Sequence, residues 1–284
     1  MNSDLTDDAV EFGATARRAL EAAGDRAAVS TVLQGLGAWD LDPARSEDEK
    51  EAAAALCRAV GWSGVPYPVA ERLARPADLD VDGLVVAAPQ AAVAGLDLRW
   101  AAVDLDGRRY SVDVGEPSGP VAKVGHVAPI TLAPLDDAGD PALALVLPCW
   151  TLLGMLDRAI ALTAAYVQQR QQFGQALSSF QSVQFQLTEA EVERVGLEEL
   201  AKYSLWSLDV DDAVALRLAA IEAAEVTFRV THQLHGAIGF CDETTLSWLS
   251  RASQPLRRLP FGLSATRDLL AARLGSSGLS GLFA

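Results

Sequence analysis

Histidine and cysteine are scarce in this sequence, with three of each among 284 residues. The cysteines (Cys57, Cys149 and Cys241) are widely spaced and form neither a zinc-binding pattern nor a disulfide framework. Free thiols are typical of a reducing compartment, so we expect a cytoplasmic protein. The first residues are acidic, and no apolar run reaches the roughly 18 residues that a membrane span needs. We therefore expect neither a secretory signal nor a transmembrane segment.

Several motifs that usually carry chemistry are also missing. The sequence has no Gly-x-Gly-x-x-Gly or P-loop segment for phosphates, and no Gly-x-Ser-x-Gly elbow for a serine nucleophile. A serine triad would need His126, His232 or His235, and none stands in such a setting. His232 and His235 are three residues apart on one predicted helix, but no His-Glu-x-x-His pattern accompanies them. We therefore expect no metal site.

Positive charge is in short supply. The chain has 23 lysines and arginines against 38 aspartates and glutamates, which gives a formal net charge of -15. A field of that sign repels phosphate backbones and anionic lipid, and this argues against nucleic-acid or membrane-surface binding. Half of the residues are hydrophobic, which is enough for a sizeable core and for two or three subdomains.

Composition divides the chain into three regions, and we expect a mainly α protein with a central β domain. Residues 1–76 show short helical patterns, and residues 77–148 contain short apolar runs between turn signals. Residues 149–284 show long helical patterns before a Gly/Ser-rich tail. We read these regions as an N-terminal helical domain, a β domain and a C-terminal helical bundle.

Individual elements can be placed within these regions. Helix caps are expected at Ser3 or Asp4 and at Ser46. The predicted strands are 84–88, 100–103, 110–114, a segment around Val124, and 142–147. The predicted turns are 106–107, 116–119 and 136–139. The predicted long helices are 150–170, 181–208, 213–234 and 264–274.

Two segments carry the most distinctive patterns. One is Arg170-Gln-Gln-Phe-Gly174, followed by Phe180-Gln181, at the junction of two helical patterns. The other is Gln233-Leu-His-Gly-Ala-Ile-Gly239, where a helix ends in a glycine-bearing turn. Taken one at a time, the arginine is explained as a helix C-cap and the glycines as helix terminators.

Taken together, the two segments resemble the FAD-contacting elements of the acyl-CoA dehydrogenase family. The match continues through Glu243, Arg251 and Arg267 and covers roughly residues 150–270. The family's architecture is a helical domain, a small β-sheet or barrel domain and a C-terminal four-helix bundle. The resemblance implies these cofactor-binding residues: Arg170, Phe173, Gly174, Gln181, Gln233, His235, Gly236 and Gly239.

The chemistry of these residues agrees with the resemblance. Arg170 offers a fork of charge-assisted donors to the pyrophosphate of FAD, and Phe173 can pack on the adenine or ribose. Gln181 and Gln233 supply neutral amide groups, and a glycine turn lets backbone N–H groups approach the cofactor closely. In the family, the two segments that meet one FAD come from different subunits, which implies an obligate oligomer.

The sequence departs from the family pattern at the catalytic base, which is a glutamate. The usual position of this base falls on Pro260, and an alternative position before the arginine segment falls on Ala144. Neither residue accepts a proton. Asp242 and Glu243 are the acidic residues near the cofactor motifs, and for Glu243 a salt bridge or cap is favoured over a base. Segments that contact the flavin ring are absent between Ala77 and Pro148, and the N-terminal domain looks shortened.

We therefore expect a small, base-less subunit of an actinobacterial-type heteromeric acyl-CoA dehydrogenase. A longer homologous chain would supply the base, this chain would complete the FAD site, and electrons would pass to an electron-transfer flavoprotein. The substrate would be an acyl-CoA thioester, such as one with a sterol side chain or another bulky acyl group. The alternatives are a homomeric flavoprotein that uses Glu243 or Asp242, and a scaffold of the same fold without flavin.

Overall fold

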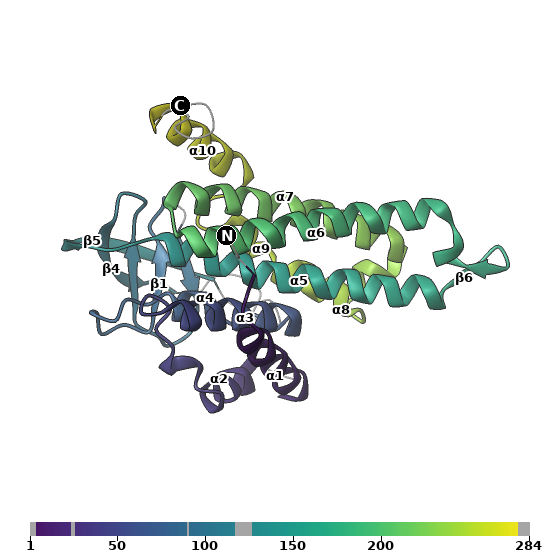
Figure 1. The fold of residues 1–284 in the computed structure, drawn as a ribbon, viewed down its shortest axis with the longest axis horizontal. Coiled ribbons are helices and arrows are strands. Elements are labelled where there is room, and N and C mark those ends of the chain that lie inside the picture. Colours follow the sequence, from purple (N-terminus) through teal and green to yellow (C-terminus); the bar gives the residue numbers. More distant parts are fainter. Residues whose placement is uncertain (1–3, 24–25, 90, 117–126, 278–284) are drawn as a thin grey trace.

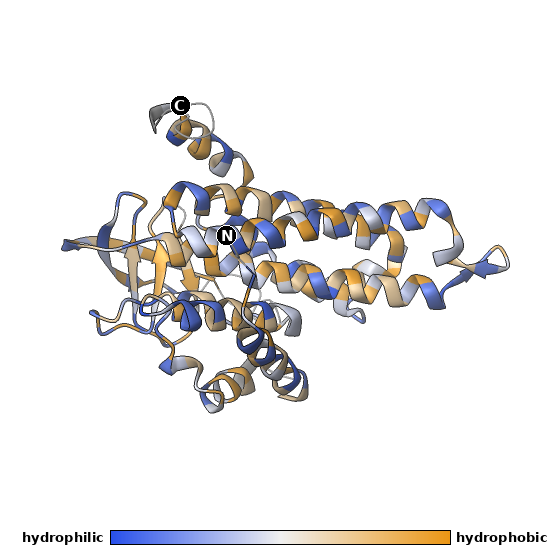
Figure 2. Cartoon of the chain, in the orientation of Figure 1, coloured by the Kyte–Doolittle hydropathy of each residue, from blue (hydrophilic) through white to orange (hydrophobic). Residues whose placement is uncertain are grey.

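The computed structural model describes residues 4–23, 26–89, 91–116 and 127–277. Within these residues, short N-terminal helices and a β-sheet lie at one end of the molecule, and a bundle of long helices extends to the other (Figure 1). Figure 2 shows apolar residues on strand β1 and hydrophilic residues on β6 at the far end of the bundle.

The N-terminal region is helical, as predicted. Its helices are α1 (Asp7–Ala23), α2 (Arg26–Gly35), a short 3-10 turn η1 (Ala38–Asp40), α3 (Glu47–Ser63) and α4 (Val69–Leu73). Ser46 caps α3 as expected, because its hydroxyl accepts a hydrogen bond from the Glu49 N–H at 3.3 Å. The cap expected for α1 is wrong at Asp4, which binds Lys202 instead; Ser3 lies outside the described residues. The Thr6 hydroxyl, just before α1, accepts a hydrogen bond from the Ala9 N–H at 3.4 Å.

The central sheet has five strands in the order β1-β3-β4-β5-β2. The strands are β1 (Gly83–Val86), β2 (Ala92–Ala94), β3 (Trp100–Val103), β4 (Arg108–Val114) and β5 (Val127–Ala138). The predictions for 84–88, 100–103 and 110–114 are confirmed, whereas β2 and β5 were not predicted. The turn expected at 136–139 is wrong, because β5 continues to Ala138 and pairs there with Arg108. The expected strand around Val124 and the turn at 116–119 lie wholly or partly outside the described residues.

The strand predicted at 142–147 is wrong, because these residues form the first turns of helix α5 (Ala142–Gln169). A short apolar run has no periodicity that separates a buried strand from a buried helix. The helix follows Pro141 at its N-cap position, and the Asp140 carboxylate accepts the N–H of its first residue, Ala142, at 2.8 Å. Among the described residues, α5 is the one helix long and apolar enough to cross a membrane, and 72% of its apolar window is buried inside the fold.

The other long helices agree closely with prediction. They are α6 (Gln181–Ser207), α7 (Val210–His235) and α10 (Leu263–Ser277), and the short helices α8 (Thr245–Ala252) and α9 (Gln254–Arg258) lie between the last two. Asp209 caps α7, because its carboxylate accepts the N–H groups of Asp211 and Asp212 at 2.8 and 3.2 Å. Helices α5, α6 and α7 pack along one another, and α10 contacts α7.

Helices α3 and α5 cross with their backbones in close contact. A Cβ atom on Gly61 would lie 1.9 Å from the carbonyl oxygen of Thr151, and one on Gly154 would lie 2.0 Å from that of Arg58. Real Cβ atoms do not approach this closely, so the crossing requires glycine at both positions. The contact fixes the N-terminal region against the bundle.

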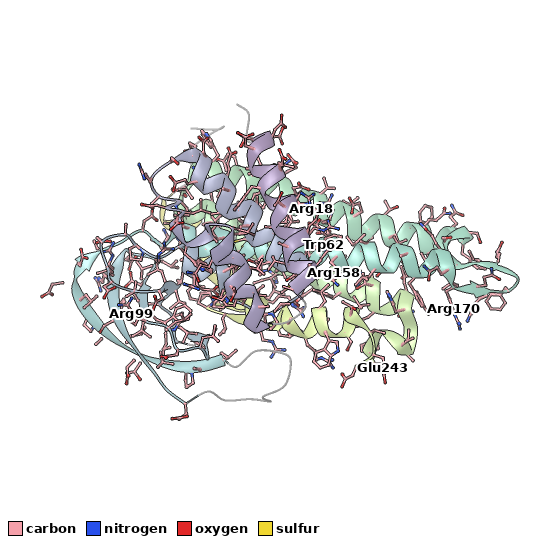
Figure 3. All side chains as sticks on the ribbon, turned by 90° about the horizontal axis from the view of Figure 1, so that it is seen from below. Arg18, Trp62, Arg99, Arg158, Arg170 and Glu243 are labelled. Atoms are coloured by element: carbon pink, nitrogen blue, oxygen red, sulfur yellow. The ribbon has the colours of Figure 1, made fainter. Side chains whose placement is uncertain are left out.

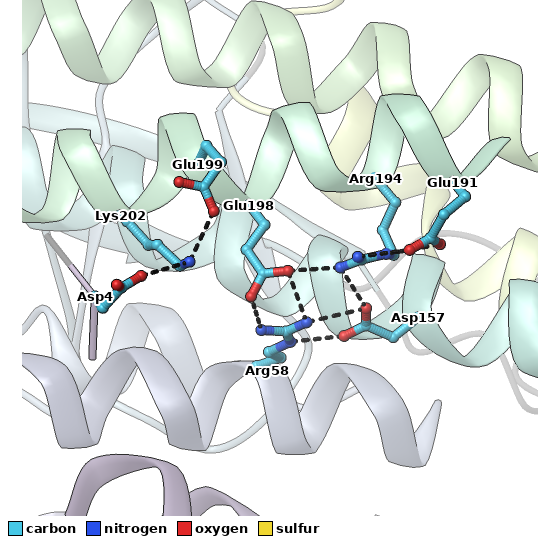
Figure 4. A network of polar contacts seen from close by, with 8 residues as sticks. All are labelled: Asp4, Arg58, Asp157, Glu191, Arg194, Glu198, Glu199 and Lys202. Carbon is cyan, nitrogen blue, oxygen red and sulfur yellow. Dashed lines mark hydrogen bonds and ion pairs between the residues drawn. The ribbon is translucent and has the colours of Figure 1, made fainter. Parts of the chain in front are cut away.

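A charged network reinforces the same junction (Figure 4). Arg58 on α3 donates to Asp157 on α5 at 2.6 Å and to Glu198 on α6 at 2.7 Å. Arg194 donates to Glu198 at 2.6 Å and to Glu191 at 2.7 Å. Burial alone raises the pKa of Glu198, but hydrogen bonds from the two guanidinium groups outweigh it and lower the pKa to about 2. The network therefore holds three helices together through ionised groups.

Candidate functional site

The segment between α5 and α6 forms a β-hairpin at the far end of the bundle. Strands β6 (Gln171–Gln172) and β7 (Gln175–Ala176) pair across a two-residue turn. Both turn residues, Phe173 and Gly174, have positive φ, at 53° and 82°. Such turns match the twist of a hairpin, but a bulky residue in this conformation is strained. Phe173 is also 91% exposed, and its ring is nearly perpendicular to that of Phe180, with the ring centroids 6.3 Å apart.

Arg170 connects this hairpin to α5. Its N–H donates to Tyr166 at the end of α5, and its carbonyl accepts the Leu177 N–H at 2.8 Å, so the backbone serves as a cap. The side chain is exposed beside the hairpin (Figure 3). Within the described part of the chain, its guanidinium group forms no ion pair and donates no hydrogen bond. An unpaired arginine on a strongly acidic protein is available to an anion.

The end of α7 packs against the end of α5. The His235 ring stacks on Tyr166 with centroids 4.4 Å apart and an interplanar angle of 14°. Its Nδ1 lies 2.9 Å from the Thr231 carbonyl, which accepts only if Nδ1 carries the proton. Burial lowers the pKa of His235 and outweighs this hydrogen bond, which raises it. The stack therefore brings the two predicted cofactor motifs to the same end of the bundle through a neutral imidazole.

The remaining predicted site residues differ in how much the fold itself requires them. Gly236 has φ 64° and ψ -147°, a conformation open essentially to glycine, and a Cβ on Gly239 would meet the His235 Cβ at 2.9 Å. Both glycines thus have a structural role, as the simpler explanation predicts. Gln181 and Gln233 are exposed on α6 and α7, where the fold does not require an amide.

The described residues provide no metal site. No group of three or more histidine, cysteine, aspartate or glutamate side chains is placed to hold an ion there. His232 stacks on Phe240 with centroids 4.4 Å apart, whereas His235 stacks on Tyr166. The two imidazole rings therefore stack on different aromatic side chains. His126 lies outside the described residues.

The two positions where the resemblance places a catalytic base lie on one cavity. Pro260 and Ala144 are 116 residues apart in the sequence, yet both line a cavity of about 130 Å³. The sheet, α4, α5 and the segment around α9 form its walls, and most lining residues are apolar. Neither residue brings a carboxylate to the cavity.

One acidic residue that sequence reasoning missed does line this cavity. Glu71 lies in α4, between the apolar residues that bury the helix. Burial raises the pKa of its carboxyl group. The sequence around Glu71 does not indicate that this residue lines a cavity, because the cavity is formed by segments far apart in the chain.

Asp242 and Glu243 lie elsewhere. The Asp242 carboxylate accepts from Arg251 at 2.7 Å, and its carbonyl accepts from the Trp248 indole at 2.6 Å. Glu243 is exposed at the edge of the bundle, away from the hairpin (Figure 3). Neither residue lines the cavity that contains Pro260. The salt bridge expected of Glu243 is formed by its neighbour Asp242.

Helix α6 presents an apolar surface to solvent. Phe185, Val192 and Val195 are 64%, 63% and 42% exposed. A shallow groove between α5 and α6 continues this surface with Ile160 and Leu187. Clustered exposed apolar residues of this kind are typical of a protein–protein contact surface.

Sequence comparisons identify the C-terminal region. Residues 146–272 match the family described as acyl-CoA dehydrogenase, C-terminal domain. Acyl-CoA dehydrogenase FadE28 of Mycobacterium tuberculosis (strain ATCC 25618 / H37Rv) is 34% identical over 125 residues, covering 42% of this chain and 37% of FadE28. Acyl-CoA dehydrogenase IpdE2 of the same organism is 26% identical over 162 residues, covering 57% of this chain and 49% of IpdE2. The chain thus aligns with about a third to a half of the length of these curated relatives.

Solved structures extend the likeness to the whole chain. A chain of the ChsE4-ChsE5 complex from Mycobacterium tuberculosis superposes with a TM-score of 0.78 at 17% identity, covering 98% of this chain and 100% of that one. The FAD complex of PigA superposes with a TM-score of 0.69 at 16% identity, covering 98% and 100%. At these identities the likeness establishes the fold, and it confirms the predicted class of a mainly α protein with a central β domain.

Proposed function

We propose that this protein, which has the acyl-CoA dehydrogenase fold and the C-terminal domain of that family, is the small subunit of a heteromeric FAD-dependent acyl-CoA dehydrogenase. A longer homologous partner supplies the catalytic base, and this chain completes the FAD site at the subunit interface. The complex carries out α,β-dehydrogenation of an acyl-CoA thioester and passes the electrons to an electron-transfer flavoprotein.

One observation carries this proposal. The two positions of the family's base meet on a single cavity and are occupied by Pro260 and Ala144, while the cofactor motifs at the far end of the bundle are intact. A chain that had lost the function altogether would have no reason to keep Arg170 unpaired or Phe173 in a strained, exposed conformation. The combination fits a chain that contributes to a cofactor site without performing the proton transfer.

The residues at the end of the bundle fit the adenosine-diphosphate part of FAD. The guanidinium group of Arg170 supplies a planar fork of donors to the two charges of a pyrophosphate. Phe173 offers an exposed aromatic face, and Gln181 and Gln233 offer amide donors and acceptors. The fold likeness to the FAD complex of PigA supports this choice of cofactor. When bound, FAD would supply the hydride acceptor of the reaction.

A homologous partner is supported by two features. The apolar surface formed by Phe185, Val192 and Val195 on α6 has no cover within the described chain. The chain in the ChsE4-ChsE5 structure with the same fold belongs to a complex of two different proteins. These side chains are 42–64% exposed, so covering each one fully would contribute about 1–2 kcal/mol.

The size of the cavity bears on the substrate. About 130 Å³ is close to the volume of a cavity that holds benzene, which is about 150 Å³. The cavity of this chain alone is thus small, and a bulky acyl group would need a surface of the partner subunit in addition. The homomeric alternative with Glu243 or Asp242 as base is not favoured, because neither residue lines this cavity.

The assignment of Arg170 can be tested in the purified complex with the partner subunit. Arg170→Ala should lower the FAD bound per complex several-fold, and Arg170→Lys should give an intermediate value because an ammonium group lacks the fork. Arg229→Ala is the matched control, since Arg229 is an exposed arginine that pairs with Glu189 at 2.6 Å. Full FAD content in Arg170→Ala would show that this residue does not bind the pyrophosphate.

A further inference from the structure

A second hollow of the molecule is a groove of about 730 Å³ between α1, α3, α5 and α6. It shares no lining residue with the cavity that contains Pro260. The close crossing of α3 and α5 separates the two, because Thr151 at one contact lines the cavity and Arg58 at the other lines the groove. Volumes of about 300–1,000 Å³ are typical of sites that hold a drug-sized molecule.

Much of the groove lining is apolar and consists of small side chains. Short side chains leave space between the helices, and an apolar ligand body that fills this space removes its own surface and theirs from water. These residues are Gly13 and Ala14 on α1, Ala55 and Ala59 on α3, and Ile160 and Ala161 on α5.

Two of the lining carboxylates belong to the charged network of Figure 4. Asp157 accepts from Arg58 at 2.6 Å, and Glu191 accepts from Arg194 at 2.7 Å. Both guanidinium groups also bind Glu198. The network is therefore balanced by its own members and leaves no charge for a ligand.

The third lining carboxylate is Glu21 on α1. It accepts the indole N–H of Trp62 at 2.7 Å and lies 3.4 Å from Arg17. The guanidinium group of Arg17 is also stacked 3.3 Å from the centroid of the Trp62 ring. All three carboxylates among the described lining residues thus face a cation of the protein itself.

Arg18 lacks such a partner. Its side chain lines the groove and donates to the Thr15 hydroxyl at 3.0 Å, and among the described residues it pairs with no carboxylate. Arg158 donates to the backbone carbonyl of Trp62 at 2.7 Å and likewise pairs with no carboxylate in the described part of the chain. Figure 3 shows Arg18, Trp62 and Arg158 on the same side of the molecule. The unmatched charge in and beside the groove is therefore positive.

We propose that this groove binds an amphipathic organic carboxylate, with the apolar body on the small side chains and the carboxylate on Arg18. A guanidinium group presents parallel donors that match the two oxygens of a carboxylate. A cationic ligand finds no unpaired carboxylate among the described lining residues, and a neutral ligand leaves Arg18 unmatched. This inference goes beyond the proposed function, because the groove requires neither flavin nor the cavity that contains Pro260.

The test uses the full chain and three probes that share one apolar body: naphthoate, naphthylmethanol and naphthylmethylammonium. Dissociation constants come from ligand-observed NMR titrations near neutral pH, and a thermal melt verifies that each variant is folded. Naphthoate should bind most tightly. Arg18→Ala should weaken naphthoate binding about fivefold and change naphthylmethanol binding less than about twofold. Arg18→Glu should reverse the order, so that naphthylmethylammonium binds more tightly than naphthoate.

The matched control is Arg99→Ala, which removes the same charge from an exposed arginine at the sheet end of the molecule (Figure 3). It should leave naphthoate binding unchanged. Ala161→Trp fills the groove from α5, and Ala14→Trp fills it from α1; both positions are exposed, and either variant should abolish naphthoate binding. Ala144→Leu fills the other cavity and should have no effect on naphthoate binding.

Several results would overturn the proposal. They are no binding of naphthoate, equal affinity for the three probes, equal effects of Arg18→Ala and Arg99→Ala, or loss of binding in Ala144→Leu alone. The groove also adjoins the apolar surface of α6 through Ile160 and Glu191, so the titration is repeated on the complex with the partner subunit. Naphthoate binding should persist there, and its loss would identify the groove as a subunit contact instead of a ligand site.

Discussion

The network that joins α3, α5 and α6 gives the most quantitative prediction. Glu198→Gln keeps the shape of the side chain and removes its charge, which leaves Arg58 and Arg194 each short of one carboxylate. The pKa of Glu198 falls from 4.5 to about 2 in the folded chain. At 1.36 kcal/mol for each pH unit, this corresponds to about 3 kcal/mol of stability at neutral pH. The side chain is 20% exposed, so screening reduces the expected cost to about 2 kcal/mol.

The pH dependence distinguishes this cause from a simple packing defect. A folded-state pKa below the unfolded value stabilises the chain at pH values above 4.5, and this stability is lost as the pH falls toward about 2. Urea unfolding at about pH 7 and about pH 3.5 should therefore show a smaller cost of Glu198→Gln at the lower pH. Glu189→Gln, in an exposed pair on the same helix, should cost less than about 0.5 kcal/mol. A cost of Glu198→Gln below that of the control, or equal at both pH values, would refute the reasoning.

Three other perturbations test separate parts of the structure. Gly154→Ala places a Cβ atom 2.0 Å from a backbone oxygen and should lower the free energy of unfolding in urea by about 3 kcal/mol or more. The control Gly196→Ala, whose Cβ would have nothing within 4 Å, should be neutral or stabilising, and equal effects of the two variants would contradict the close helix crossing. Glu71→Gln should raise the melting temperature at about pH 7.5 but not near pH 4. The reason is that a pKa raised in the folded chain costs stability only as the pH rises above the pKa of the unfolded chain. A difference in melting temperature that does not depend on pH would argue against desolvation of this carboxyl group. Asparagine adopts a positive φ with less strain than phenylalanine, so Phe173→Asn should stabilise the isolated chain slightly. The same variant should lower FAD retention in the complex. Unchanged retention would show that Phe173 does not pack on FAD.

Periodicity predicted the elements whose sequence pattern is long. Helices α6 and α7 each extend over more than 25 residues, so the helical repeat is unambiguous, and their bounds agree with prediction to within about three residues. The run at 142–147 was assigned to a strand because six apolar residues fit either structure. Strand β5 was missed because its alternation includes Pro129 and Pro134, residues that usually argue against a strand.

The candidate site was predictable where it depends on contiguous motifs. Arg170, Phe173 and the glycine turn could be found from local patterns alone. The strain at Phe173 could not be found, because a positive φ at a phenylalanine contradicts its residue preference. Glu71 could not be found either, because the sheet, α4, α5 and the segment around α9 must come together before the cavity exists.

The central claim is that this chain completes a FAD site only together with a longer homologous subunit. Flavin absorbance and native mass, measured on the chain expressed alone and then co-expressed with that subunit, test it most directly. The account predicts a colourless chain alone and a yellow heteromer with one FAD for each pair of different subunits. A yellow homomer that turns over acyl-CoA without a partner would contradict the account.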